Sequence, residues 1–158
     1  FKDTHIDGAA VFLLHDGVYA LPVVVDPLVM YCNRDILATK ALAQPPRTWE
    51  ELVAITVPAI VEKTYTLDIT RAALAFGEYV NIRNAKSILS LLFIQAGSNM
   101  VVDDGTRISV VLDRGQSQGI APATASLNFY ALFSNPAKSV YTWNRSMPED
   151  RSECVAGD

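Results

Sequence analysis

Residues 19–51 read YALPVVVDPLVMYCNRDILATKALAQPPRTWEE, and this stretch predicts more of the fold than any other part of the chain. Its first half is an apolar run that Asp26 and Pro27 interrupt. Because proline has no backbone N–H to give to a sheet, a strand formed here should bend or change sheets at Pro27. We therefore expect a hinge at Asp26-Pro27, followed by a stop to the strand at Asn33-Arg34-Asp35.

The residues on either side of this stretch predict a hairpin and a helix. Upstream, Asp16-Gly17 separates the apolar runs 11–14 and 18–25, and Asp-Gly between apolar runs is a strong hairpin signal. Downstream, Thr48 and Glu51 have the spacing of a capping box, which predicts a helix starting at Trp49. Pro58 should break or kink that helix.

The rest of the chain alternates helical and strand patterns. Residues 84–96 are apolar nearly all round and stop at Gly97, which predicts a buried helix with a glycine cap. A second helix should run from Pro122 to about Phe133. Short strands are expected at residues 74–76, 100–102 and 108–112. This alternation predicts an α/β domain.

Composition and charge exclude several classes of protein. The chain has 158 residues, half of them hydrophobic, which suits one globular domain with a sizeable core. Its formal net charge of -4 offers no clustered basic surface for nucleic acid, so no nucleic-acid partner is expected. The longest apolar run, residues 18–25, is too short to cross a bilayer, which takes about 20 residues.

One motif raises the possibility of catalysis. Residues 115–119 read GQSQG and fit the G-x-S-x-G pattern of a nucleophile elbow centred on Ser117. In hydrolases with this elbow the catalytic histidine follows the serine, whereas His5 and His15 both precede Ser117. A polar surface loop is the favoured interpretation, and no catalytic residue is predicted. A serine hydrolase using Ser117 stays as the alternative.

Metal and cofactor patterns are weak. Asp103-Asp104-Gly105 lacks the further ligands of a calcium loop and predicts a turn between two strands. His5 with Asp3 and Asp7 would need more ligands from elsewhere. Neither Cys32 nor Cys154 belongs to a close cysteine pair of the zinc-binding kind. We predict no metal and no cofactor, expect Cys32 to be a buried apolar residue, and leave open whether the two cysteines pair.

Aromatic residues fall into two groups. One group has helical spacing and should lie in the core: Phe129, Tyr130 and Phe133. The other group could offer flat faces for stacking on sugar rings: Trp49, Tyr79, Tyr141 and Trp143.

Four segments, which together span nearly the whole chain, carry a resemblance to a known family. In order they read YALPVVVDPLVMYCNRDIL, PPRTWEEL, FGEYVNIRNAKSILSLLFIQAG and SLNFYALFSNPAKSVYTWNRSMPEDRSECVAGD. Taken together they resemble the extracellular solute-binding proteins of ABC importers, the family that includes the maltose-binding type.

This resemblance implies a fold and a set of ligand-facing residues. It implies a type II periplasmic-binding-protein-like α/β fold, of which this chain would be one incomplete lobe with hinge strands. Residues 1–27 would form the hinge hairpin and the crossover from a first lobe, and residues 28–158 a second lobe truncated at its C-terminus. The ligand-facing candidates are Asp26, Glu78, Tyr79 and Asn81.

The function that the resemblance implies is that of a receptor without enzymatic activity. It would capture an extracellular solute, a saccharide, by closure of two lobes, and would deliver it to the permease of an ABC transporter. The protein would be extracytoplasmic, with any lipid anchor outside this chain. Besides the hydrolase, the alternative is a stand-alone interaction module that keeps the fold without transport.

Overall fold

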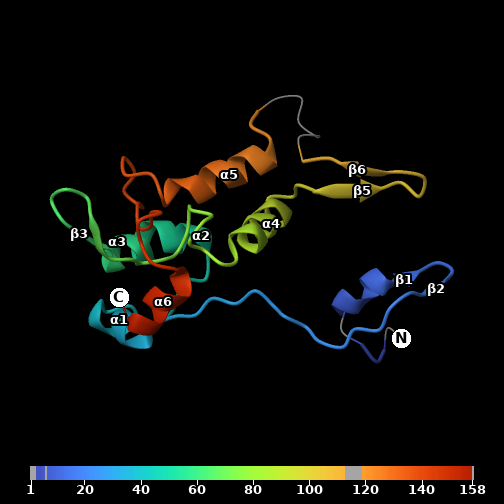
Figure 1. Cartoon of the computed structure of the whole chain (residues 1–158), viewed down its shortest axis with the longest axis horizontal. Helices are drawn as coiled ribbons and strands as arrows, with labels where there is room; N and C mark the ends of the chain where they lie inside the picture. Colours follow the sequence, from blue (N-terminus) through green and yellow to red (C-terminus); the bar gives the residue numbers. More distant parts are fainter. Residues whose placement is uncertain (1–2, 6, 113–118, 158) are drawn as a thin grey trace.

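The computed structural model describes residues 3–5, 7–112 and 119–157, and it combines helices with short antiparallel hairpins (Figure 1). A 3₁₀ helix, Asp7–Phe12, opens the chain. Among these described residues, the helical segments and strands that follow have these bounds: β1 Leu13–Leu14, β2 Gly17–Val18, α1 Arg34–Thr39, α2 Trp49–Glu51, a π-helical turn Leu52–Thr56, α3 Val57–Ile60, β3 Glu62–Lys63, β4 Ile69–Arg71, α4 Ala85–Gln95, β5 Val101–Asp103, β6 Ile108–Val110, α5 Pro122–Leu132 and α6 Asp150–Ala156.

The predicted N-terminal hairpin is present but short. β1 pairs with β2 in antiparallel register, Leu13 opposite Val18 and Leu14 opposite Gly17. The prediction of a strand over residues 18–25 is wrong beyond Val18, because the chain from residue 19 to residue 32 is extended and pairs with no strand among the described residues. We call residues 19–32 the apolar connector. Its prolines, Pro22 and Pro27, both lack the backbone N–H that a strand ladder needs.

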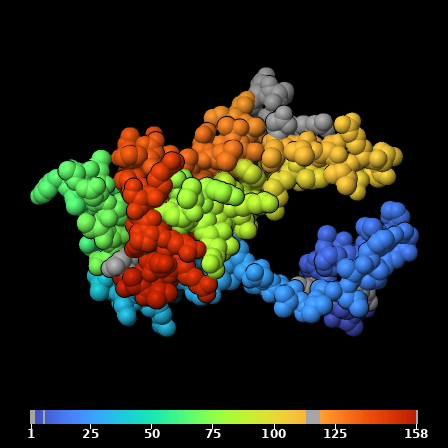
Figure 2. Space-filling view, viewed as in Figure 1, coloured from blue at the N-terminus to red at the C-terminus, as the bar shows by residue number. Residues whose placement is uncertain are grey.

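The apolar connector exposes much of its hydrophobic surface. Val23 is 95% exposed. Most of its other large apolar side chains also face solvent, namely Leu21, Val24, Val25, Leu28, Val29, Met30 and Tyr31. In Figure 1 the connector is the long blue trace that joins the N-terminal hairpin to α1, and in Figure 2 it forms a narrow neck between the hairpin and the packed body.

Local side-chain chemistry starts the two helical segments that follow the connector. Asn33 caps α1, its Oδ1 accepting from the backbone N–H groups of Asp35 and Ile36 at 3.0 and 3.2 Å. Thr48 caps α2 as predicted, accepting from the Glu51 N–H at 3.1 Å. The Glu51 carboxylate departs from the capping-box pattern, because it accepts from the backbone N–H of Arg47 at 2.9 Å.

Pro58 distorts its helix without ending it. The Val57 N–H bonds to the carbonyl of Leu52, five residues back, which makes a π turn immediately before the proline. This wider turn lets the helix continue into α3 although Pro58 has no N–H to donate.

The described strands pair only with their neighbours along the sequence. β3 pairs with β4 and β5 with β6, both antiparallel, so the described sheets are two-stranded hairpins. The strands expected at residues 100–102 and 108–112 are found as β5 and β6, joined by the predicted turn at Asp103-Asp104-Gly105. The strand expected at residues 74–76 is wrong, because this segment packs on helices and has no strand beside it.

The two long helices occupy the predicted ranges. α5 begins at Pro122, and α4 is followed by Gly97 in the left-handed conformation with φ +77°. The prediction that α4 is buried is wrong. Its apolar surface is covered on one side by α5 and the core, and Leu91 and Ile94 on the other side are exposed. Among the described residues, no helix has the length and apolarity needed to cross a bilayer.

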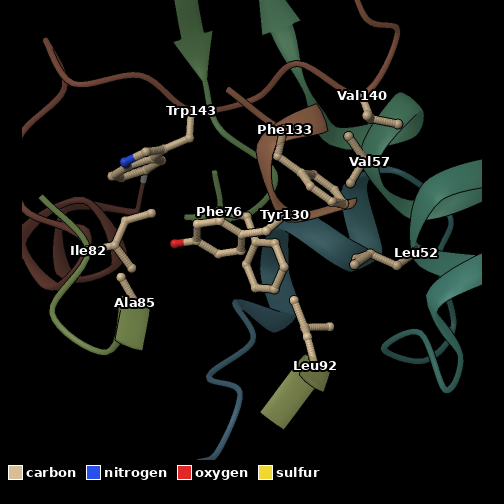
Figure 3. Packing of buried hydrophobic residues seen from close by; sticks show 10 residues of the cluster. All are labelled: Leu52, Val57, Phe76, Ile82, Ala85, Leu92, Tyr130, Phe133, Val140 and Trp143. Carbon is tan, nitrogen blue, oxygen red and sulfur yellow. The ribbon is translucent and has the colours of Figure 1, made fainter. Parts of the chain in front are cut away.

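The core is an aromatic cluster between α2, α4 and α5 (Figure 3). The Phe76 ring lies 4.8 Å from the Tyr130 ring and 5.1 Å from the Phe133 ring, the latter edge to face. Phe133 and Tyr130 are buried, as their helical spacing predicted, and Phe129 packs against the edge of the cluster. Edge-to-face contacts of this kind add to the free energy gained from burial.

A buried segment, residues 140–143, crosses over this cluster. Its backbone N–H groups at Thr142 and Trp143 both donate to the carbonyl of Phe133, at 2.9 and 3.2 Å. The Thr142 Oγ1 accepts from the Ala73 N–H at 2.7 Å. These bonds satisfy backbone groups that would otherwise be buried without partners, and they fix the chain after α5 against the core.

Phe133→Ala tests the aromatic cluster. Phe133 has no exposed surface, so the truncation should leave a cavity and lower the free energy of unfolding by about 3 to 5 kcal/mol, measured by urea denaturation. The control is Ile94→Ala on the exposed side of α4, which should cost less than about 0.5 kcal/mol. Similar losses for both variants would contradict this account of the core.

Candidate functional site

The candidate site is the loop of residues 77–81, between β4 and α4, which contains three of the four predicted ligand-facing residues. It begins at Gly77, whose φ of +95° is left-handed. A Cβ placed on Gly77 would come within 2.6 Å of the Ser134 backbone nitrogen and 2.8 Å of its Cβ. Only glycine lets the loop come this close to the end of α5.

Two hydroxyl groups hold the loop backbone. The Ser134 hydroxyl donates to the carbonyl of Gly77 at 2.9 Å, and the Tyr130 hydroxyl donates to the carbonyl of Glu78 at 2.6 Å. Figure 3 shows the Tyr130 oxygen pointing away from Phe133, toward the side of the cluster where Ile82 and Trp143 lie. The helical spacing predicted Tyr130 as a core residue without this role. The signal in the sequence is a tyrosine between Phe129 and Phe133, because a buried phenol needs a hydrogen-bond acceptor.

Asn81 is buried and its amide is used within the chain. Its Nδ2 donates to the carbonyls of Asn144 and Met147, both at 2.9 Å, and its Oδ1 accepts from the Trp143 Nε1 at 3.2 Å. The Asp150 N–H also donates to its backbone carbonyl at 3.0 Å. This is a different role from the predicted ligand contact, since the amide has no free donor left for a solute. Asn81 positions the loop.

Glu78 and Tyr79 have contrasting environments on the same loop. The Glu78 side chain is only 15% exposed and lies 3.6 Å from a guanidinium nitrogen of Arg145, whose own side chain is largely exposed. Tyr79 is 69% exposed. The loop therefore presents an aromatic face to solvent beside a paired carboxylate and guanidinium. Such a set can accept from and donate to hydroxyl groups and cover an apolar ring edge.

Asp26 lies elsewhere, on the apolar connector. It is exposed, and within the described ranges it forms no hydrogen bond or ion pair. The structure thus gathers Glu78, Tyr79 and Asn81 on one loop and leaves Asp26 on a separate segment.

Three of the four aromatics considered for stacking on sugars are engaged in the core. Trp143 is 2% exposed, and Tyr141 is buried with its hydroxyl accepting from Asn144 at 2.9 Å. Trp49 packs its ring against Phe76 and donates its Nε1 to Gln95 at 2.8 Å. The stacking interpretation is wrong for the buried pair Tyr141 and Trp143, and Tyr79 offers the exposed ring.

The remaining sequence candidates form no second site within the part of the chain that the structure describes. Ser117 lies outside the described residues, so the elbow motif has no structural account. In the described part of the chain, no three or more His, Cys, Asp or Glu side chains are grouped to hold a metal ion. Cys32 and Cys154 are free thiols, and Cys32 is half-buried where full burial was expected.

Comparison with protein-family models, with curated proteins and with solved structures finds no match to this chain.

Gly77→Ala tests the close approach of the loop to α5. The variant should lose about 2 to 4 kcal/mol of unfolding free energy, because an unfavourable φ and a clash with the Ser134 backbone act together. Gly97→Ala is the matched control. Gly97 has φ +77° with nothing within 4 Å of an added Cβ, so this variant should lose only about 1 kcal/mol. Equal losses in urea denaturation would show that the contact does not constrain the loop.

Alkaline pH tests the Tyr130 hydrogen bond. Burial, with the nearby Glu78 and Asp150 carboxylates, raises the pKa of Tyr130 to about 12. The folded state therefore favours the neutral phenol. Its stabilising contribution should be complete below the ordinary tyrosine pKa of about 10 and should be lost as the pH rises from there towards 12.

Tyr130→Phe isolates this contribution. At neutral pH the variant should be less stable by about 0.5 to 1.5 kcal/mol, since it lacks the bond to the Glu78 carbonyl. The stability difference between the two proteins, followed by urea denaturation, should narrow above about pH 10. A difference that stays constant across this range would argue against a buried, hydrogen-bonded phenol.

Proposed function

We propose that this chain is the hinge and second lobe of a two-lobed solute receptor with a type II periplasmic-binding-protein-like fold, serving an ABC importer and recognising a saccharide. The order of the four segments named above supports the family, and the properties of the apolar connector and of the loop 77–81 support the function. The receptor binds without catalysis.

The observation that carries the proposal is the exposed and unpaired state of the apolar connector. A row of valines, leucines and aromatics in water, with backbone groups that pair with no strand, is unfavourable unless another surface covers it. A first lobe would supply that surface. The connector would then become the strand that passes between lobes, with its bend at Pro27.

The loop 77–81 supplies the chemistry for a saccharide. Sugar hydroxyls come in neighbouring pairs that a carboxylate such as Glu78 can accept from, while the guanidinium of Arg145 donates to ring or hydroxyl oxygens. The exposed ring of Tyr79 can stack on the apolar edge of a pyranose. Asp26 would reach the same solute from the hinge side when the lobes close.

Hinge closure is the proposed mechanism. Residues of the connector around Asp26 can change φ and ψ without breaking any strand pairing among the described residues, since none is formed there. Closing buries the solute between lobes, and the closed form would then engage the membrane permease. The receptor would act outside the cytoplasm.

Tryptophan fluorescence can report solute binding at the loop, because the Trp143 indole donates to Asn81 directly behind it. The titration uses the complete receptor with Trp49→Phe, so that Trp143 is the only tryptophan of this lobe, against mono- and oligosaccharides. We expect a saturable signal, weakened about tenfold or more by Tyr79→Ala through loss of stacking. Asp26→Ala should weaken binding in the same way.

The matched control for Tyr79→Ala is Tyr65→Ala, which removes a fully exposed tyrosine from the β3–β4 turn and should leave the affinity unchanged. A folded protein that gives no signal with any sugar would remove the saccharide assignment. Equal losses for both tyrosine variants would remove the loop from the site. Labelling of Ser117 by a fluorophosphonate would overturn the receptor proposal in favour of the serine hydrolase.

A further inference from the structure

The C-terminal end of α6 lies against the start of α1. A Cβ placed on Gly157, the C-cap of α6, would be 3.8 Å from the Nδ2 of Asn33, the N-cap of α1. Asn33 and Gly157 also line the same shallow pocket, together with Ile36. Figure 1 shows α6 beside α1. Two segments that are distant in the sequence therefore meet at these capping residues.

Both cysteines of the chain flank this contact. Cys32 directly precedes Asn33, and Cys154 lies three residues before Gly157. Cys154 lies in the last turn of α6, so both cysteines are within one helical turn of the residues that meet. Both thiols are free in this structure, Cys32 partly buried and Cys154 exposed.

Electrostatics agree with this placement. Burial raises the pKa of the Cys32 thiol, and the neighbouring thiolate of Cys154 raises it further. A thiolate raises the pKa of another thiol in this way only when the two groups are close together.

We infer that Cys32 and Cys154 form a disulfide under oxidising conditions, which fastens the end of the apolar connector to α6. The inference rests on the contact between α1 and α6 and on the positions of the two thiols, and it does not require a saccharide or a transporter. An oxidising compartment, as proposed for the receptor, is where such a bond persists.

The reaction balances with a small-molecule disulfide such as oxidised glutathione. The exposed Cys154, as a thiolate, attacks the glutathione disulfide and releases one glutathione thiolate. The Cys32 thiolate then attacks the Cys154 sulfur of the mixed disulfide and releases the second. The protein loses two electrons and two protons, and the oxidant becomes two molecules of glutathione.

The bond would have a clear structural effect. It would close most of the chain into one loop, which restricts the unfolded ensemble and so favours the folded state. It would also fix the connector at Cys32, so that any change of direction falls upstream, at Asp26-Pro27.

Peptide mapping of the purified chain tests the inference. The chain is equilibrated in a glutathione redox buffer, its remaining thiols are alkylated, and it is digested with trypsin without reduction. We expect residues 3–34, which contain Cys32, to be joined to residues 152–158, which contain Cys154. The intact mass of the monomer should fall by two hydrogen atoms, and its urea midpoint should rise on oxidation.

Cys32→Ser and Cys154→Ser, made separately, are the controls. Each should show a glutathione adduct on the remaining cysteine and no rise in urea midpoint on oxidation. The inference is overturned if the folded chain keeps both thiols alkylatable in the most oxidising buffer. It is also overturned if oxidation yields only glutathione adducts or disulfide-linked dimers.

Discussion

The ring of Phe76 contacts aromatic rings from both sides of the core. Trp49 lies on α2, Tyr130 lies on α5, and Phe133 is the C-cap of α5. Because Phe76 directly precedes Gly77, this contact places the start of the candidate loop against the end of α5. Gly77 then permits the close approach to Ser134, and the hydroxyls of Ser134 and Tyr130 hold the next two carbonyls. The position of Glu78 and Tyr79 thus follows from one packing contact and the turn after it.

Some side chains of the loop 77–81 hold the loop in place, and others are exposed to solvent. The amide of Asn81 makes its hydrogen bonds within the chain. If these buried bonds were broken, two carbonyls would lose their donor, and the free energy lost would exceed what the bonds contribute when formed. The Tyr79 side chain, by contrast, is largely exposed to solvent. The Glu78 side chain is mostly covered and lies beside the guanidinium of Arg145, whose side chain is exposed. A backbone held by hydrogen bonds thus carries an exposed ring and a mostly covered carboxylate, which suits the binding loop proposed above.

The sequence correctly predicts those helix boundaries that have a local cause. The start of α2 at Thr48, the start of α5 at Pro122 and the stop after α4 at Gly97 each depend on one residue and its own backbone. Features that depend on contacts between residues far apart in the sequence were not predicted correctly. Residues 74–76 look like a strand but pack on helices, and Asn81 meets Trp143 62 positions away along the chain. The apolar connector has the composition of a β-strand. A strand forms only when a neighbouring strand pairs with it, and the composition of the connector does not show whether such a neighbour is present.

The two prolines of the apolar connector have a consequence for how this chain behaves in concentrated solution. Val23, Val24 and Val25 form an exposed β-branched run of the kind that recruits identical copies into intermolecular sheets. Pro22 and Pro27 bracket that run, and neither can donate to a growing ladder. A second copy could therefore form only a few consecutive bonds before the pairing is interrupted, and the charge of Asp26 repels its own counterpart at the same place. The residues that prevent regular pairing here also protect the chain against aggregation.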